Sequence, residues 1–181
     1  MPEVTSYTPG TFCWPELSTT DQKGAVAFYR ALFGWDVKDL GGAVFCVWQP
    51  KVHIGATIIR EPNTLCWTEL LTGDTPAAEH FYTRLFGWTA KKGTAAPHEY
   101  TEFAVAGTPD SGKMPLDPAW GPVPPHWLSY FQVVDCDQAA DKGNELGGKV
   151  LTPPADIPTV GRFALVQDPQ GATFGLFTHR P

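Results

Sequence analysis

Glu69 is the residue in this sequence with the clearest capacity for chemistry. Its carboxyl group stands in a mostly apolar segment, TLCWTELL at residues 64–71. A carboxylate in apolar surroundings has a raised pKa and could act as a general acid or base, or it could bind a cationic group of a ligand. Glu16 holds the equivalent place in a second, similar segment, so a structural role for the shared glutamate stays open.

Histidine and cysteine, which also carry chemistry in proteins, are scattered along the chain. The four cysteines show no C-x-x-C spacing, which predicts no zinc ribbon, and without a secretory signal we expect reduced thiols. Of the five histidines, His126 directly precedes a predicted strand and is the one we expect closest to a ligand. A structural or exposed position is the alternative for each of them.

The composition excludes several classes of protein. Of 181 residues, 43% are hydrophobic and 18% are charged, which is typical of a globular protein and not of a disordered chain. The net charge of −6, with 13 Lys and Arg, predicts no nucleic-acid partner and no polybasic contact with a membrane. No apolar run approaches the ~20 residues of a membrane span. Residues 1–10 also lack a secretory signal, so we expect a cytoplasmic protein.

The segments that hold Glu16 and Glu69 are copies of one unit. Residues 11–35 and 64–88 align at an offset of 53 without a gap, and 14 of their 25 positions are identical. In each copy an alternating stretch predicts a strand, and an aspartate then precedes a helix with apolar residues at i, i+3 and i+4. Gly34 and Gly87 are predicted to end the two helices.

Short strand-like runs follow each predicted helix, so each unit has the order β-α-β-β-β. The predicted strands lie at residues 13–19, 36–40, 43–48 and 52–59 in the first unit and at 66–72, 89–92, 100–106 and 113–116 in the second. A third, diverged unit follows a linker with five prolines at residues 115–125. Its strands are predicted at 127–134, 149–152, 162–167 and 173–177, with a weak helix at 138–146.

These motifs resemble the vicinal oxygen chelate superfamily, which includes glyoxalase I, extradiol dioxygenases and the bleomycin-resistance proteins. The resemblance rests on Cys-Trp-x-Glu-Leu with Phe-Tyr-x-x-Leu-Phe-Gly-Trp, present twice, and on the third unit through Asp168-Pro169-Gln170-Gly171. It implies an α+β fold of three βαβββ modules. Two of them, residues 64–116 and 126–179, are expected to pair into an incomplete cupped barrel around a cavity.

The resemblance also implies how the chain is divided. Residues 62–181 would hold the paired modules, and residues 1–61 a single module without a partner, as in a four-module relative that has lost its first trailing module. Because an open sheet edge promotes association, we expect a homodimer through residues 9–61. The alternative is that the first module packs against its own barrel in a monomer.

Enzymes of the superfamily hold a divalent metal with side chains from the first and fourth strands of each module. The corresponding positions here are Trp67, Leu128 and Gly175, which have no suitable donor atom. The fourth strand of the second module offers Lys113, Met114 and Pro115, which are no better. We therefore expect no metal and no other cofactor.

The alternation of side chains along a strand predicts the wall of the cavity. If Trp67 faces inward, so do Glu69 and Leu71, whereas Cys66 faces the helix. Glu69 and Tyr130 are the candidate catalytic residues. The other candidates for ligand binding are Trp67, Leu71, Leu128, Tyr100 or Phe103 on the third strand, Met114 and Trp120 in a lid, His126 at the rim and Phe177 on the last strand.

Three functions fit this sequence. The first is a metal-free protein that sequesters an aromatic or amphipathic small molecule, as the drug-resistance relatives do. The second is an enzyme in small-molecule biosynthesis, either without a cofactor or with a metal at other positions. The third is a protein-interaction module whose interface is the first module.

Overall fold

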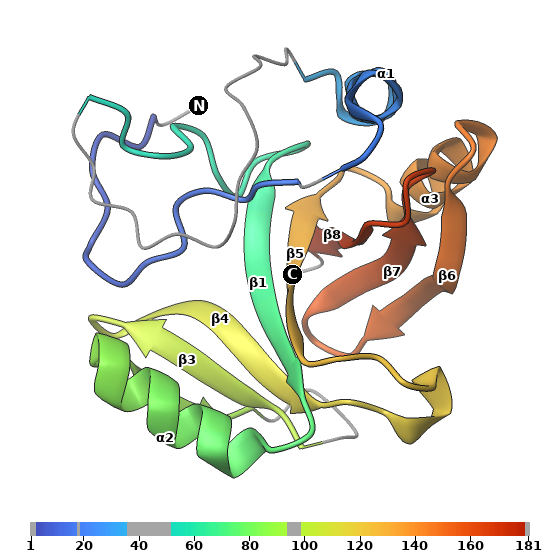
Figure 1. The fold of residues 1–181 in the computed structure, drawn as a ribbon. Helices are drawn as coiled ribbons and strands as arrows, with labels where there is room; N and C mark the ends of the chain where they lie inside the picture. The colour runs from blue at the N-terminus through green and yellow to red at the C-terminus, as the bar shows by residue number, and fades with distance from the viewer. Residues whose placement is uncertain (1–2, 18, 36–51, 94–98, 180–181) are drawn as a thin grey trace.

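A single eight-stranded sheet forms the body of the protein (Figure 1). The structure is a computed structural model that describes residues 3–17, 19–35, 52–93 and 99–179. The strand order is β2-β3-β4-β1-β5-β8-β7-β6, so β2 and β6 are the edges of a sheet that does not close.

The second and third modules contribute four strands and one helix each. The second contains β1 (Leu65–Thr72), α2 (Thr75–Phe86), β2 (Thr89–Lys92), β3 (Thr101–Val105) and β4 (Thr108–Pro115). The third contains β5 (His126–Gln132), α3 (Cys136–Glu145), β6 (Lys149–Ile157), β7 (Gly161–Gln167) and β8 (Thr173–His179). The short helix η1 (Pro118–Trp120) lies in the linker between them.

The two modules meet at β1 and β5, which run antiparallel in the middle of the sheet. Within each module the first strand pairs in parallel with the last, β1 with β4 and β5 with β8. This arrangement confirms the predicted α+β fold with two paired βαβββ modules.

Helix boundaries follow the signals in the repeat. The side chains of Asp21, Asp74 and Asp135 each accept a hydrogen bond from a backbone N–H in the first turn of their helix. Gly34 and Gly87 end the helices α1 (Gln22–Phe33) and α2 with φ values of 74° and 70°, a conformation that costs glycine little.

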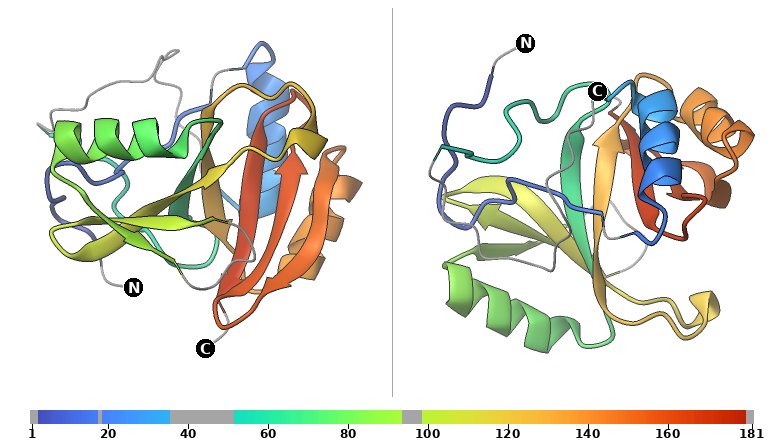
Figure 2. Two further views of the ribbon diagram at one scale, coloured as in Figure 1. Left: turned by 90° about the horizontal axis from the view of Figure 1, so that it is seen from below. Right: turned by 45° about the horizontal axis from the view of Figure 1, so that its top comes forward.

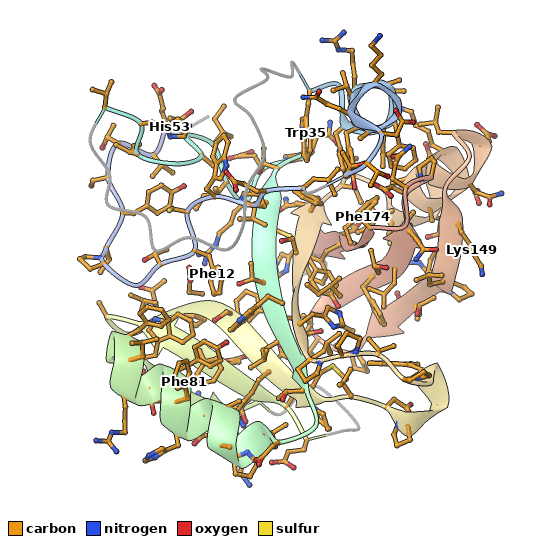
Figure 3. All side chains as sticks on the ribbon, viewed as in Figure 1. Phe12, Trp35, His53, Phe81, Lys149 and Phe174 are labelled. Carbon is orange, nitrogen blue, oxygen red and sulfur yellow. The ribbon has the colours of Figure 1, made fainter. Side chains whose placement is uncertain are left out.

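Helices cover one face of the sheet, which we call the outer face. Over the third module, α1 and α3 lie side by side (Figures 1 and 2). Their apolar side chains join β5 and β8 in one core cluster, where Phe174 lies between the sheet and α1 (Figure 3). Over the second module, Tyr82 and Phe86 of α2 pack against Trp88, Phe103 and Val105. None of the helices in the described ranges is long and apolar enough to cross a membrane.

The first module differs from the prediction. Its helix α1 forms, but the predicted strands at residues 13–19 and 52–59 do not form in the described residues of those ranges. The predicted strands at 36–40 and 43–48 lie outside the described residues. A strand needs a neighbour with which to share backbone hydrogen bonds. The segment around Cys13 instead bonds to Ala56 and runs over the second module, where Phe12 packs against Trp88 and Trp127.

The two copies of the repeat helix have different surroundings. Phe28 and Leu32 of α1 are 3% and 6% exposed, because they face α3 and the outer face of the third module. The equivalent residues of α2, Phe81 and Leu85, are 57% and 56% exposed (Phe81 is labelled in Figure 3). The same apolar residues at equivalent positions therefore differ in burial, because only α1 has a neighbouring helix among the described elements.

Candidate functional site

The face of the sheet opposite the helices, which we call the inner face, carries a separate apolar cluster. Leu71, Leu128 and Tyr130 are buried at its centre. Half-buried side chains surround them and come from both modules: Cys66, Trp67, Met114, Leu116, Phe163, Leu165 and Phe177. This surface is apolar and rich in aromatic rings, which is typical of small-molecule sites.

Glu69 is the buried carboxyl group within this cluster, and its side chain is hydrogen-bonded to two tyrosines. The residue is 8% exposed. The hydroxyl of Tyr130 donates to Glu69 Oε1 over 3.0 Å, and the hydroxyl of Tyr100 also bonds to the carboxyl group. Trp67 Nε1 in turn donates to the Tyr100 hydroxyl over 3.0 Å. The four side chains form one chain of hydrogen bonds across β1, the segment before β3, and β5.

Burial controls the protonation of these groups. Removal from water raises the pKa of Glu69, and the hydrogen bonds from Tyr130 and Tyr100 lower it by less. Burial beside the same carboxyl group also raises the pKa of Tyr130 and of Tyr100. The arrangement therefore favours a neutral carboxylic acid held by two neutral phenols.

Two glycines give the tyrosine rings their space. In the sheet register Glu69 lies opposite Gly112 on β4, and Tyr130 lies opposite Gly175 on β8. A Cβ atom added at Gly112 would clash with the Tyr100 hydroxyl, and one added at Gly175 would clash with the Tyr130 ring. The last strand of each module, β4 or β8, thus has a glycine at the point where a tyrosine of the site packs against it.

The residues at the superfamily's metal positions do not fit a metal ion. Trp67 and Leu128 on the first strands, and Gly112 and Gly175 opposite the site on the last strands, offer no side-chain lone pair suited to a divalent cation. Throughout the described ranges, no group of three or more His, Cys, Asp and Glu side chains is arranged to hold one. We derive no metal-dependent step for this site.

Most of the residues predicted for the cavity lie together on the inner face. Trp67, Glu69, Tyr100, Tyr130 and the apolar residues Leu71, Met114, Leu128 and Phe177 all belong to the cluster or to its hydrogen-bond chain. His126 lies at the end of β5, opposite Leu71, and its Nδ1 is 2.9 Å from the Pro124 carbonyl oxygen. Trp120 lies on η1 and is 43% exposed.

Phe103 and Cys66 lie elsewhere than the sequence predicts. Phe103 is fully buried on the outer face beneath α2, so of the two residues offered for the third strand only Tyr100 lies at the site. Cys66 belongs to the inner cluster because the register shifts between Leu65 and Trp67 and places two successive side chains on one face.

Sequence reasoning missed four residues of this face, namely Leu116, Phe163, Leu165 and Gly112. On β7, Phe163 and Leu165 alternate with Ala164 and Val166, which are buried in the outer core. This alternation could have predicted that Phe163 and Leu165 face the inner side of the sheet. Gly112 carries no signal of its own, because its role depends on the register between β1 and β4.

A cavity of about 240 Å³ lies away from this site. It is formed between the N-terminal segment and the β3–β4 hairpin, and its wall includes Tyr7, Arg60 and Asp110. The inner face is the stronger candidate for function because it combines a buried acid with aromatic side chains of both modules.

Comparison with known proteins agrees with this architecture. The model of the Glyoxalase/Bleomycin resistance protein/Dioxygenase superfamily matches residues 64–176. CFP32 of Mycobacterium tuberculosis is 30% identical over 260 aligned positions, which cover 100% of this chain and 99% of CFP32. Because this chain has 181 residues, CFP32 contains residues without a counterpart here.

Two further proteins resemble part of this chain. The anthracycline biosynthesis protein DauV of Streptomyces sp. (strain C5) is 38% identical over 143 residues, which span 76% of this chain and 50% of DauV. The solved structure of the hypothetical protein BH1468 from Bacillus halodurans shares the fold, with a TM-score of 0.51, 10% identity, and coverage of 65% of this chain and 95% of that one. The chain belongs to the Glyoxalase/Bleomycin resistance protein/Dioxygenase superfamily.

Proposed function

We propose that this protein binds and sequesters a flat aromatic or amphipathic small molecule at the inner face, without a metal ion. The observation that carries the proposal is the buried hydrogen bond between Glu69 and Tyr130 within an apolar surface. In such a site a small number of polar groups orient the ligand, and the aromatic side chains supply most of the binding free energy.

The half-buried aromatic side chains support this function. Trp67, Phe163 and Phe177 come from three strands and both modules. A planar ligand that covers them would remove apolar surface from water, which contributes about 25 cal/mol per Å². Trp67 also donates to Tyr100, so a ligand against its ring would be next to the hydrogen-bond chain.

A second candidate function is proton transfer in a biosynthetic pathway. Glu69 has a raised pKa and a hydrogen-bonded tyrosine beside it, which are the requirements of a general acid or base that works without metal. The name of DauV as an anthracycline biosynthesis protein supports a biosynthetic setting for such a reaction.

We also propose that the chain forms a homodimer through residues 9–61 and works in the cytoplasm. Trp14, Leu17 and Val52 of that segment are 41%, 40% and 100% exposed, and a partner surface that covers them would remove apolar area from water. Cys13 and Cys66 are free thiols, as a reducing compartment would keep them. Sedimentation equilibrium at micromolar concentration tests the dimer, and a monomer there would overturn it.

A screen of planar compounds by quenching of tryptophan fluorescence tests the binding function. We expect micromolar binding that is weakened in Trp67→Phe. The matched control is Trp14→Phe, because Trp14 is the equivalent tryptophan of the first repeat, is 41% exposed and lies outside the inner cluster. Turnover of a bound compound that is lost in folded Glu69→Gln would establish the enzyme instead. Absence of any small-molecule binding would contradict both and favour the protein-interaction module.

A further inference from the structure

We infer that the ligand of the inner face is uncharged and presents a hydrogen-bond acceptor, a carbonyl-type oxygen, to the protonated carboxyl group of Glu69. The inference rests on the proposed function and names the chemical class of the ligand at that site. It follows from the surroundings of Glu69, from the directions of the hydrogen bonds around it and from the two glycines that fix the tyrosines.

The surroundings of Glu69 do not favour a charge. The side chain lies among Leu71, Leu128 and other apolar groups, and its hydrogen-bond partners Tyr130 and Tyr100 are neutral phenols. A buried carboxylate without a cationic partner is costly, so the group is retained in its neutral form.

The basic side chains on the nearby strands either have other partners or lie far from Glu69. Lys113 on β4 points to the outer face, where its Nζ lies 3.0 Å from Glu79. Arg162 on β7 binds Asp137 and Asp156. Lys91 lies on β2, which β3 and β4 separate from β1, a distance of roughly 14 Å at the usual strand spacing.

Donor and acceptor counting then leaves one free group. Tyr130 donates to Glu69 Oε1, and the Tyr100 oxygen accepts from Trp67 Nε1. The Tyr130 proton is therefore used, and the Tyr100 oxygen already has a donor. The proton of the carboxylic acid is the donor left for a ligand, and its complement is an acceptor such as a ketone, quinone or amide oxygen.

Gly112 and Gly175 are positioning residues for this arrangement. The Tyr100 hydroxyl lies against Gly112 and the Tyr130 ring lies against Gly175, and any larger residue at either position would displace them. The two phenols thus approach Glu69 from opposite modules, which leaves the acid proton as the group that meets the ligand.

Three compounds with one skeleton test the inference. Fluorenone carries a carbonyl oxygen, fluorene lacks it, and 9-aminofluorene carries a cationic amine in neutral solution. Each is titrated by tryptophan fluorescence into the wild-type protein, Glu69→Gln and Glu69→Leu, with folding checked by urea denaturation. Glutamine keeps an N–H donor without a charge, whereas leucine has no donor.

We expect the wild-type protein to bind fluorenone about two- to tenfold more tightly than fluorene, the range of one neutral hydrogen bond. Glu69→Gln should keep that preference, and Glu69→Leu should lose it. Tightest binding of 9-aminofluorene, lost in Glu69→Gln, would overturn the inference while leaving the proposed function in place. Failure of all three compounds to bind the folded wild-type protein would overturn the proposed function itself.

Discussion

Glu69 and Tyr130 hold equivalent places in the two paired modules and are bonded directly to each other. Each stands five residues before the aspartate that begins its module's helix, Asp74 or Asp135. Because β1 and β5 run antiparallel at the centre of the sheet, the two side chains meet, and the Tyr130 hydroxyl donates to Glu69 Oε1 over 3.0 Å. A site shared by both modules results from this pairing.

The raised pKa of Glu69 predicts that stability depends on pH. In the folded state the neutral acid is favoured, so this group's contribution is fully present below its unfolded pKa, near 4.5, and is lost as pH rises through the folded pKa. Glu69→Gln removes this titration. Urea denaturation should show the variant gaining stability relative to the wild-type protein between pH 4.5 and pH 8. A difference between the two proteins that is constant with pH would contradict the assigned protonation.

Replacement of Gly175 by alanine should destabilise the protein. The new Cβ clashes with the Tyr130 ring, and overpacking of this kind costs about 1–3 kcal/mol. Gly73→Ala is the matched control, because nothing lies within 4 Å of its added Cβ, and we expect a change within about 0.5 kcal/mol. Urea denaturation measures both. Equal effects would mean that Tyr130 does not lie on Gly175.

The two repeat helices offer a matched pair of deletions. Phe28→Ala should cost about 3–5 kcal/mol, because Phe28 is buried between α1, α3 and the sheet. Phe81→Ala, at the equivalent position of α2, should cost less than about 1 kcal/mol, because Phe81 is 57% exposed. Similar losses of stability for the two variants in dilute protein would contradict this, because they would mean that another surface covers Phe81 on α2.

Substitutions at Phe103 and Tyr100 should affect different properties, the stability of the protein and its affinity for the ligand. Phe103→Leu alters the core beneath α2 and should cost about 1–2 kcal/mol of stability without changing ligand affinity. Tyr100→Phe removes a hydroxyl from the Glu69 network and should weaken fluorenone binding several-fold. Denaturation and titration of both variants measure the two effects. Weakened binding in Phe103→Leu with normal binding in Tyr100→Phe would reverse the assignment of the two faces.

Local signals explain why much of the site could be predicted. The strand alternation and the distance from Asp74 and Asp135 place Glu69, Leu71, Leu128 and Tyr130 on one face. Helix ends follow from capping aspartates and left-handed glycines, which act within a few residues.

The features that the sequence does not show depend on distant residues. The register shift at Leu65 and Trp67 brings Cys66 inward, and the register of β1 with β4 gives Gly112 its role. The strands predicted at 13–19 and 52–59 do not form in the described residues of those ranges for the same kind of reason, since a strand forms only where another strand supplies hydrogen bonds. The choice between Tyr100 and Phe103 depends on where β3 begins, because that decides which of the two side chains faces inward.

The most direct test of the account is a titration of fluorenone into protein dialysed against EDTA, followed by tryptophan fluorescence. The metal-free site predicts micromolar affinity that is the same, within about twofold, before and after chelation and after addition of zinc or manganese. Loss of binding on chelation, restored by a divalent metal, would contradict the claim that Glu69, Tyr100 and Tyr130 form the site without one.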